Sequence, residues 1–239
     1  MTTKAVLFDL DNTLYDYDTP HKKSLKEVHK VLTKHISISF SRFIKLFNLA
    51  KCEIHRELAG SASSHNRVLY FQRLIEKTHN TVEPSLILKL YKTYWDTLLK
   101  NISLRKGVLD VLKQLKKKGI KIAIVSDLTT HIQLRKLEQV RISKYVDILV
   151  TSEEAGSEKP HAIMFLLALN KLNVSPHEAI MVGDNAIADV EGANFVGLYT
   201  VLLAKGKLAK RYKEDYRRSD CVIKNISETL DVLNKINHF

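Results

Sequence analysis

The sequence predicts an α/β protein in which helices cover both faces of a parallel sheet and a second, all-helical unit is inserted into the chain. Two observations lead to this prediction. Short apolar runs rich in Val and Ile recur along the chain, and each is separated from the next by a segment with helical periodicity. Between residues 21 and 100 these runs disappear and helical patterns follow one another. We therefore expect a three-layer α/β core with an inserted domain of four helices.

The predicted strands are continuous apolar runs that are too short for helices, which is typical of strands buried on both faces of a parallel sheet. They span residues 4–8, 120–125, 146–150, 179–182 and 198–203. Because a helical segment lies between successive strands, the chain should form right-handed βαβ connections. The expected core is therefore a Rossmann-like parallel sheet.

The segments between the strands carry helix signals. Residues 107–119 have apolar positions at helical spacing, a run of lysines suited to the negative end of the helix dipole, and Gly119 as a C-cap. Residues 175–178 form a capping box with proline at the first helical position. Further helices are predicted over residues 130–140, 162–172 and 227–236.

The insertion shows four amphipathic patterns in succession, with breaks near residues 37–41 and 60–64. Apolar stripes of this kind form the core of a helix bundle. We therefore expect an α/β core domain made of residues 1–17 and 101–239, and a helical domain made of residues 18–100.

Composition and charge limit the possible partners. Hydrophobic residues make up 45% of the chain and charged residues 27%, which excludes a disordered or collagen-like protein. The net charge of +12 favours anionic partners, such as phosphorylated metabolites, nucleic acid or a membrane surface. The basic segment 205–218 contains no recognisable RNA-binding or DNA-binding module, so we expect a solvated basic face there rather than a nucleic-acid site.

Two further expectations concern the compartment and the cysteines. No apolar run approaches the ~18 residues of a membrane span, and the first residues do not resemble a signal peptide. We therefore expect a cytoplasmic protein without a membrane partner. The cysteines Cys52 and Cys221 lack the spacing of metal ligands and are expected to be buried free thiols.

Acidic and polar residues follow the predicted strands, at the edge where an open parallel sheet binds its ligands. They are Asp9 and Asp11 after the first strand, Ser126 and Asp127 after the second, Lys159 after the third, and Asp184 and Asp189 after the fourth. Carboxylates that meet at one edge repel one another unless a cation lies among them, and oxygen ligands suit magnesium bound to a substrate phosphate. Together with a lysine and a hydroxyl group, this set predicts phosphoryl transfer.

The same residues lie in four motifs: LFDLDNTL at residues 7–14, IAIVSD at 122–127, KP at 159–160 and VGDNAIAD at 182–189. In this order they resemble the haloacid dehalogenase-like (HAD) superfamily of aspartate-nucleophile phosphohydrolases, and the resemblance covers the whole chain. The inserted helices are similar to the C1-type cap of that family. The sequence departs from the commoner pattern at Lys106, at Asp127 and after Pro160, where a second proline is missing, but not at the residues of the core chemistry.

The resemblance implies a role for each motif residue. Asp9 would attack phosphorus to form an aspartyl-phosphate, while Asp11 would protonate the leaving group and later activate water. The implied ligands of Mg²⁺ are Asp9, the backbone carbonyl of Asp11, and Asp184, with Asp189 beside them as a further ligand or as a supporting residue. The implied phosphate-binding residues are Ser126, Asp127 and Lys159; for Asp127 a helix cap is the alternative.

We therefore expect a Mg²⁺-dependent phosphatase of a small phosphorylated metabolite. An acid at position 11 serves a phosphatase and is of no use to a dehalogenase, and a cap that closes over the site favours small substrates. Arg67, in the polar segment 63–70 of the insertion, is a candidate substrate contact, although a solvated helix end is the alternative.

Two other functions stay open. A phosphotransferase or phosphomutase would use the same chemistry with another acceptor, and a non-catalytic binding protein would keep the fold alone. The intact Asp9, Asp11, Lys159 and Asp184 argue against the non-catalytic protein. The sequence identifies neither the metabolite nor the oligomeric state, which is expected to be a monomer or a homodimer.

Overall fold

The computed structural model describes residues 2–204 and 215–237. The chain divides into two compact units. The core unit contains the residues up to Asp16 and those from Ser103 onward, and the helical unit is Tyr17–Ile102. Of the predicted basic segment 205–218, residues 205–214 lie outside the described ranges.

The described part of the core unit contains one parallel sheet of six strands, in the order β3-β2-β1-β4-β5-β6. The strands are β1 (Ala5–Phe8), β2 (Lys121–Ser126), β3 (Ile148–Thr151), β4 (Ala179–Gly183), β5 (Tyr199–Leu203) and β6 (Cys221–Ile223). The first five coincide closely with the predicted apolar runs, and the predicted α/β fold class is confirmed. The short strand β6 was not predicted, because three residues give no periodic signal.

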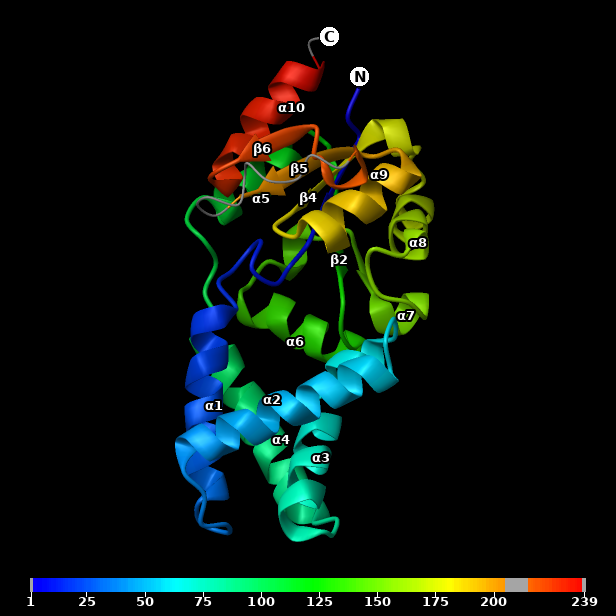
Figure 1. The fold of residues 1–239 in the computed structure, drawn as a ribbon. Coiled ribbons are helices and arrows are strands. Elements are labelled where there is room, and N and C mark those ends of the chain that lie inside the picture. The colour runs from blue at the N-terminus through cyan, green and yellow to red at the C-terminus, as the bar shows by residue number, and fades with distance from the viewer. Residues whose placement is uncertain (1, 205–214, 238–239) are drawn as a thin grey trace. The chain divides into compact units, whose positions relative to one another are not determined.

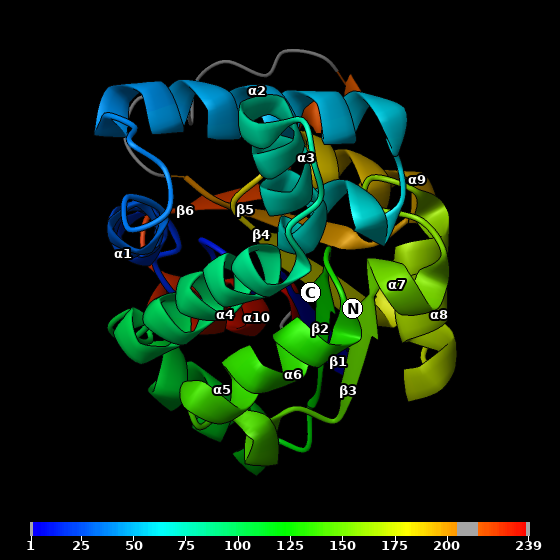
Figure 2. The same ribbon diagram turned by 90° about the horizontal axis from the view of Figure 1, so that it is seen from below.

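Helices lie on both sides of this sheet (Figure 1 and Figure 2). The longer ones are α5 (Val108–Lys117), α6 (Thr130–Gln139), α8 (Ala162–Leu172) and α10 (Thr229–Asn237). The short elements are α7 (Ser152–Ala155), α9 (Gly192–Val196), η2 (Ser143–Tyr145), η3 (Pro176–Glu178), the π-helical turn η4 (Ala186–Glu191), η6 (Asp215–Arg217) and η7 (Ile226–Glu228). Strand residues such as Leu7 and Val125 are fully buried against Met164 and Phe165 of α8. Burial on both faces explains why the strands are continuously apolar.

The helical unit, all of which the structure describes, contains α1 (Asp18–Leu32), α2 (Phe40–Glu57), η1 (Ala62–His65), α3 (Arg67–His79) and α4 (Pro84–Asn101). Its α-helices correspond to the four predicted amphipathic patterns, so the inserted four-helix part of the predicted fold is also confirmed. Helix α1 packs along α4, and α3 packs against both α2 and α4. Phe47 of α2 is buried in this unit and packs against the rings of Phe43, Tyr70 and Phe71.

The prediction of buried thiols is wrong. Cys52 is exposed, and Cys221 is partly exposed on β6. On α2 the buried residues Ala50 and Ile54 are one helical turn apart, so Cys52, midway between them, faces the opposite side of the helix.

The order of the strands brings the predicted site residues to one edge of the sheet. β1 pairs with β2 on one side and with β4 on the other, so the connections leave β1 in opposite directions. Such a switch point opens a crevice at the carboxyl ends of parallel strands. Asp9 directly follows β1, Ser126 ends β2, and Asp184 directly follows β4.

Gly192, the first residue of α9, is packed tightly against the segment that follows Lys159. A Cβ atom at this position would lie 2.5 Å from the Phe165 ring and 2.5 Å from the carbonyl oxygen of Pro160. Because a buried ring and a backbone atom yield little, we expect Gly192→Ala to lower the free energy of unfolding by about 1–3 kcal/mol in urea titrations. At Gly60 no atom lies within 4 Å of an added Cβ, so in Gly60→Ala only the positive φ of the backbone should lower the free energy of unfolding. A Gly192→Ala variant as stable as the wild type would contradict this packing.

Candidate active site

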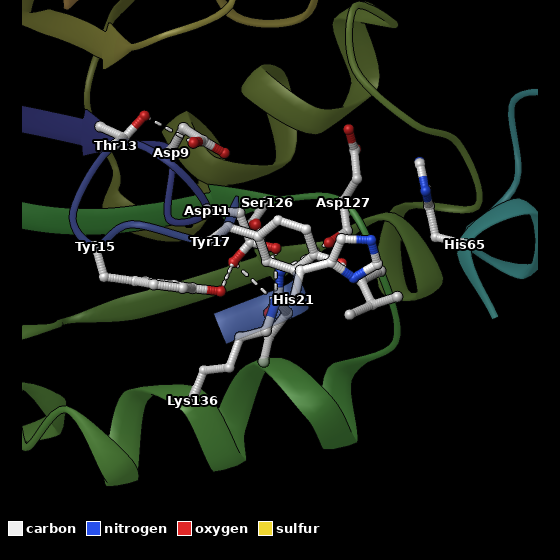
Figure 3. Close-up of polar contacts among 12 residues, drawn as sticks. Asp9, Asp11, Thr13, Tyr15, Tyr17, His21, His65, Ser126, Asp127 and Lys136 are labelled. Atoms are coloured by element: carbon white, nitrogen blue, oxygen red, sulfur yellow. Dashed lines mark hydrogen bonds and ion pairs between the residues drawn. The ribbon is translucent and has the colours of Figure 1, made fainter. Parts of the chain in front are cut away.

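Asp9 is buried at the end of β1, and both of its carboxylate oxygens accept hydrogen bonds. Lys159 Nζ donates to Oδ1 over 2.7 Å. The hydroxyl group of Thr13 donates to Oδ2 over 2.8 Å (Figure 3). The backbone N–H of Asp9 donates to the carbonyl of Val182 in β4, which fixes the residue against the sheet. Burial raises the pKa of Asp9 to about 6, although the ammonium group of Lys159 opposes this shift.

Lys159 is surrounded by carboxylates. Its Nζ also donates to Asp189 Oδ1 over 2.6 Å, and its backbone N–H donates to Asp127 Oδ1 over 2.9 Å. Burial by itself would lower the pKa of Lys159, but Asp189 and Asp9 hold it well above its usual value. The ammonium group is therefore charged, and it offsets part of the negative charge around it.

Three carboxylates at this edge can each offer an oxygen to a common metal ion. Ligand atoms of Asp9, Asp184 and Asp189 all lie within 4.8 Å of one another. Asp9 and Asp189 are buried and Asp184 is partly buried. Burial raises the pKa of Asp189, although the ammonium group of Lys159 opposes this shift. A cluster of carboxylate oxygens fits a hard divalent cation such as Mg²⁺.

Gly183 makes room for this cluster. A Cβ atom at Gly183 would lie 2.2 Å from Asp189 Oδ2. The backbone N–H of Asn185 donates to the same oxygen over 3.0 Å. A glycine before Asp184 therefore lets the carboxylate of Asp189 pack directly against the end of β4.

The carboxylate of Asp11 has different partners (Figure 3). Lys136 Nζ donates to Oδ1 over 2.8 Å and to Oδ2 over 2.6 Å, and the hydroxyl group of Tyr15 donates to Oδ1. The side chain of Lys136 is 0% exposed, and that of Asp11 is 30% exposed. The side chain of Asp11 is thus not in the three-carboxylate group, and its predicted link to a metal is through the backbone carbonyl alone.

Ser126 and Asp127 are also bonded to protein groups. Gln133 Nε2 donates to Ser126 Oγ over 2.6 Å and to the backbone carbonyl of Asp127 over 2.7 Å. Burial raises the pKa of the Asp127 carboxyl, which accepts the bond from the backbone of Lys159. Contact of Asp127 with phosphate stays a prediction; in the structure its side chain anchors the Lys159 segment.

Gln133 and Lys136 were not predicted as site residues from the sequence. Both lie on the buried face of α6, together with Ile132 and Leu137. The available signal was their spacing, because two polar residues occupy positions that the helical period assigns to the same face as the apolar ones. A lysine in a helix is normally solvated, so composition alone gave no reason to select it.

Arg67, at the start of α3, lies among aromatic rings of the helical unit. Its guanidinium is 5.2 Å from the ring centre of Tyr70, 5.7 Å from that of Tyr94 and 5.5 Å from that of Trp95. Its terminal nitrogens donate to the hydroxyl group of Tyr17 and to a backbone carbonyl. Within the described residues, its Nε is buried without a hydrogen-bond partner. A side chain at a solvated helix end would not be enclosed by three aromatic rings in this way.

Lys51 and two histidines lie near Arg67. Burial and the charge of Arg67 lower the pKa of His21 to about 4, and the same two causes lower the pKa of Lys51. Burial, Lys51 and Arg67 lower the pKa of His55. This part of the helical unit is therefore electropositive.

Residues 6–203 match the family described as haloacid dehalogenase-like hydrolase. The chain belongs to this family. It is 42% identical to a ribulose-1,5-bisphosphate 5-phosphatase from Halopiger xanaduensis, and the match covers 83% of each chain. It is 31% identical to a glyceraldehyde 3-phosphate phosphatase from Methanopyrus kandleri, with 98% of each chain covered. A HAD phosphatase structure from Thermococcus onnurineus is 26% identical, with a TM-score of 0.74, and the match covers 97% of this chain and 98% of that one.

These similarities confirm the predicted family and the predicted enzyme class, a hydrolase of the HAD type. Across the described ranges, none of the helices combines the length and the apolar character needed to cross a membrane.

His21 gives the helical unit a pH-dependent contribution to stability. Its pKa is about 4 in the folded chain against 6.5 without burial, so the unfolded chain binds more protons between these pH values. This contribution is complete above about pH 6.5 and is lost as the pH falls towards 4. We expect the wild type to lose about 1–2 kcal/mol more unfolding free energy across this interval than His21→Asn, in urea titrations at several pH values.

The exposed His177 of the core unit provides the matched control. His177→Asn should keep the wild-type dependence of stability on pH. If His21→Asn also kept it, the burial of a neutral His21 would be refuted.

Proposed function

We propose that this hydrolase is a Mg²⁺-dependent phosphatase that removes the phosphoryl group from a small phosphorylated metabolite through an aspartyl-phosphate on Asp9. The observation that supports this most directly is the group of Asp9, Asp184 and Asp189 with Lys159 bonded to two of its members. Their position at the switch point of the sheet is where such folds bind ligands. The phosphatase activities of the relatives support the same conclusion.

In the first step, a carboxylate oxygen of Asp9 attacks phosphorus. The bond from this oxygen to phosphorus forms as the bond from phosphorus to the substrate oxygen breaks, and Asp11 gives its proton to the departing alkoxide. Lys159 and Ser126 bind the phosphoryl oxygens and offset the charge that develops on them. The products of this step are the free alcohol and the aspartyl-phosphate.

In the second step, water hydrolyses the aspartyl-phosphate. Asp11, now ionised, accepts a proton from the water, whose oxygen attacks phosphorus as the bond to Asp9 breaks. Inorganic phosphate leaves, Asp9 returns as a carboxylate, and Asp11 is again protonated. One residue thus acts first as the acid and then as the base.

The cofactor in this proposal would be held by the carboxylates of Asp9, Asp184 and Asp189 and by the backbone carbonyl of Asp11. When bound, Mg²⁺ supplies positive charge that offsets the carboxylates and the phosphoryl oxygens. Thr13, which is bonded to Asp9 and lies 3.4 Å from Asp184 Oδ1, keeps two of these side chains together.

The proposed substrate is a phosphate ester of a short sugar. The relatives named above act on ribulose-1,5-bisphosphate and on glyceraldehyde 3-phosphate, which are both small sugar phosphates. Arg67 is proposed to bind an anionic or polar group of the substrate, because its buried Nε has no partner among the described residues and its surroundings are electropositive.

The first test measures phosphate release from a panel of sugar phosphates and p-nitrophenyl phosphate, with and without Mg²⁺. We expect Asp9→Asn to reduce kcat by at least about a thousandfold, because the amide cannot act as the nucleophile. Asp110→Asn, which changes an exposed carboxylate of the same unit, should keep full activity. Release that persists in Asp9→Asn, or that ignores removal of Mg²⁺, would refute the mechanism.

Product analysis in the same assay separates the alternatives. Stoichiometric inorganic phosphate supports hydrolysis, whereas an isomerised or newly phosphorylated sugar would show transfer to a second substrate. No turnover by a folded wild type with any ester would favour a binding protein instead.

The second test concerns Arg67. We expect Arg67→Ala to raise KM for a sugar bisphosphate by about tenfold, the loss of one charge-assisted hydrogen bond, and to leave KM for p-nitrophenyl phosphate unchanged. Arg73→Ala, on the same helix but paired with Glu53 and Glu57, should change neither value. Equal KM changes for both esters would end this assignment.

A further inference from the structure

Helix α6 presents two polar side chains to the interior, and each is bonded to a different residue of the proposed site. Gln133 and Lys136 are both 0% exposed. They are three positions apart, so they lie next to each other on one face of the helix. Gln133 contacts Ser126, and Lys136 contacts Asp11. Burying the NH₂ group of Gln133 and the ammonium group of Lys136 is costly unless both are bonded, which makes this face more than a packing surface.

The bonds of Gln133 determine which way the hydroxyl group of Ser126 can act. A backbone carbonyl only accepts hydrogen bonds, so the atom of Gln133 that lies 2.7 Å from the carbonyl of Asp127 must be the NH₂ nitrogen. The second hydrogen of that nitrogen is then directed to Ser126 Oγ, 2.6 Å away. Because Ser126 Oγ accepts this bond, its own proton is available to a phosphoryl oxygen.

The bonds of Lys136 fix the carboxylate of Asp11. Its ammonium group contacts both oxygens, and the hydroxyl group of Tyr15 contacts one of them. Lys136 Nζ also lies 5.9 Å from the centre of the Tyr15 ring. If the ionised side chain of Asp11 rotated away, it would leave a fully buried ammonium group without its carboxylate, which is strongly unfavourable. Asp11 is therefore restrained to one orientation.

We propose that the buried face of α6 positions two residues of the site. Gln133 orients the hydroxyl group of Ser126 so that it donates to the phosphoryl group, and Lys136 holds Asp11 where it protonates the leaving oxygen. This inference rests on the proposed phosphatase function. Neither residue touches the reacting atoms, so both are positioning residues.

The two residues should differ in their dependence on the leaving group. An alkoxide needs a proton as it departs, whereas p-nitrophenolate is stable at neutral pH and departs without one. The ratio kcat/KM reports the steps up to formation of the aspartyl-phosphate. Loss of Lys136 should therefore reduce kcat/KM for an alkyl phosphate and spare the aryl phosphate, while loss of Gln133 should affect both.

The experiment compares Lys136→Met, Lys136→Arg and Gln133→Met with two control variants of the core unit. Lys116→Met removes a lysine paired with Asp147 on the surface, and Gln114→Met removes an exposed glutamine. Each protein is assayed with glyceraldehyde 3-phosphate and p-nitrophenyl phosphate, and its thermal unfolding is measured. Inhibition by inorganic phosphate gives a second readout of the phosphoryl-binding groups.

We expect Lys136→Met to lower kcat/KM for the alkyl ester by about 10–100-fold and for the aryl ester by less than about threefold. Lys136→Arg should recover part of the loss. Gln133→Met should lower both ratios by about tenfold and weaken inhibition by phosphate by a similar factor. The controls should match the wild type throughout.

Equal losses for both esters in Lys136→Met, or wild-type kinetics in either positioning variant, would overturn the inference. If Lys136→Met does not fold, Tyr15→Phe removes the other hydrogen bond to the Asp11 carboxylate and keeps the ring, and it should show a smaller loss that is again confined to the alkyl ester. Failure of the proposed function looks different, because the wild type itself would then release no phosphate.

Discussion

The contact on which the site depends is the buried ion pair of Lys159 with Asp9 and Asp189. The ammonium group of Lys159 lies 2.7 Å from the carboxylate of Asp9 and 2.6 Å from that of Asp189. These three residues come from segments that follow three different strands. Removing such a charge from water costs several kcal/mol unless the partners are close and well oriented. The fold must therefore hold all three segments in register, and the parallel pairing of β1 with β4, the anchoring of Lys159 by Asp127 and the absent side chain at Gly183 each contribute to this.

Most of the fold and the charged centre of the site could be predicted from the sequence, because their signals are local. Buried strands produce uninterrupted apolar runs, and the acids that follow those strands meet wherever parallel strands end together. The partners of these acids were not predictable in the same way. Lys136 meets Asp11 across 125 positions of sequence, and nothing in the segment around either residue encodes that contact. Gln133 was missed for the same reason, and the three-residue strand β6 was missed because it carries no periodic signal.

The two polar clusters of the core unit differ in electrical character. Lys136 and Asp11 form a one-to-one pair that is neutral when Asp11 is ionised, and the hydroxyl group of Tyr15 adds a further hydrogen bond to Asp11. Lys159, in contrast, lies against two carboxylates, with Asp184 nearby as a third. A neutral, fully bonded pair is suited to holding a group in place, whereas an incompletely neutralised cluster is suited to binding a cation.

In the proposed phosphatase, the charge of the second cluster would also limit the order in which its ligands bind. With Asp9, Asp184 and Asp189 ionised and Lys159 protonated, three negative charges face one positive charge, and the net charge of the cluster is −2. A phosphate ester carries negative charge itself and would be repelled by this arrangement. Burial already raises the pKa of Asp9 to about 6, so without another cation this carboxylate takes up a proton more readily than a solvated one. A divalent cation cancels the excess charge without protonating the nucleophile, which makes the same carboxylates compatible with an anionic substrate.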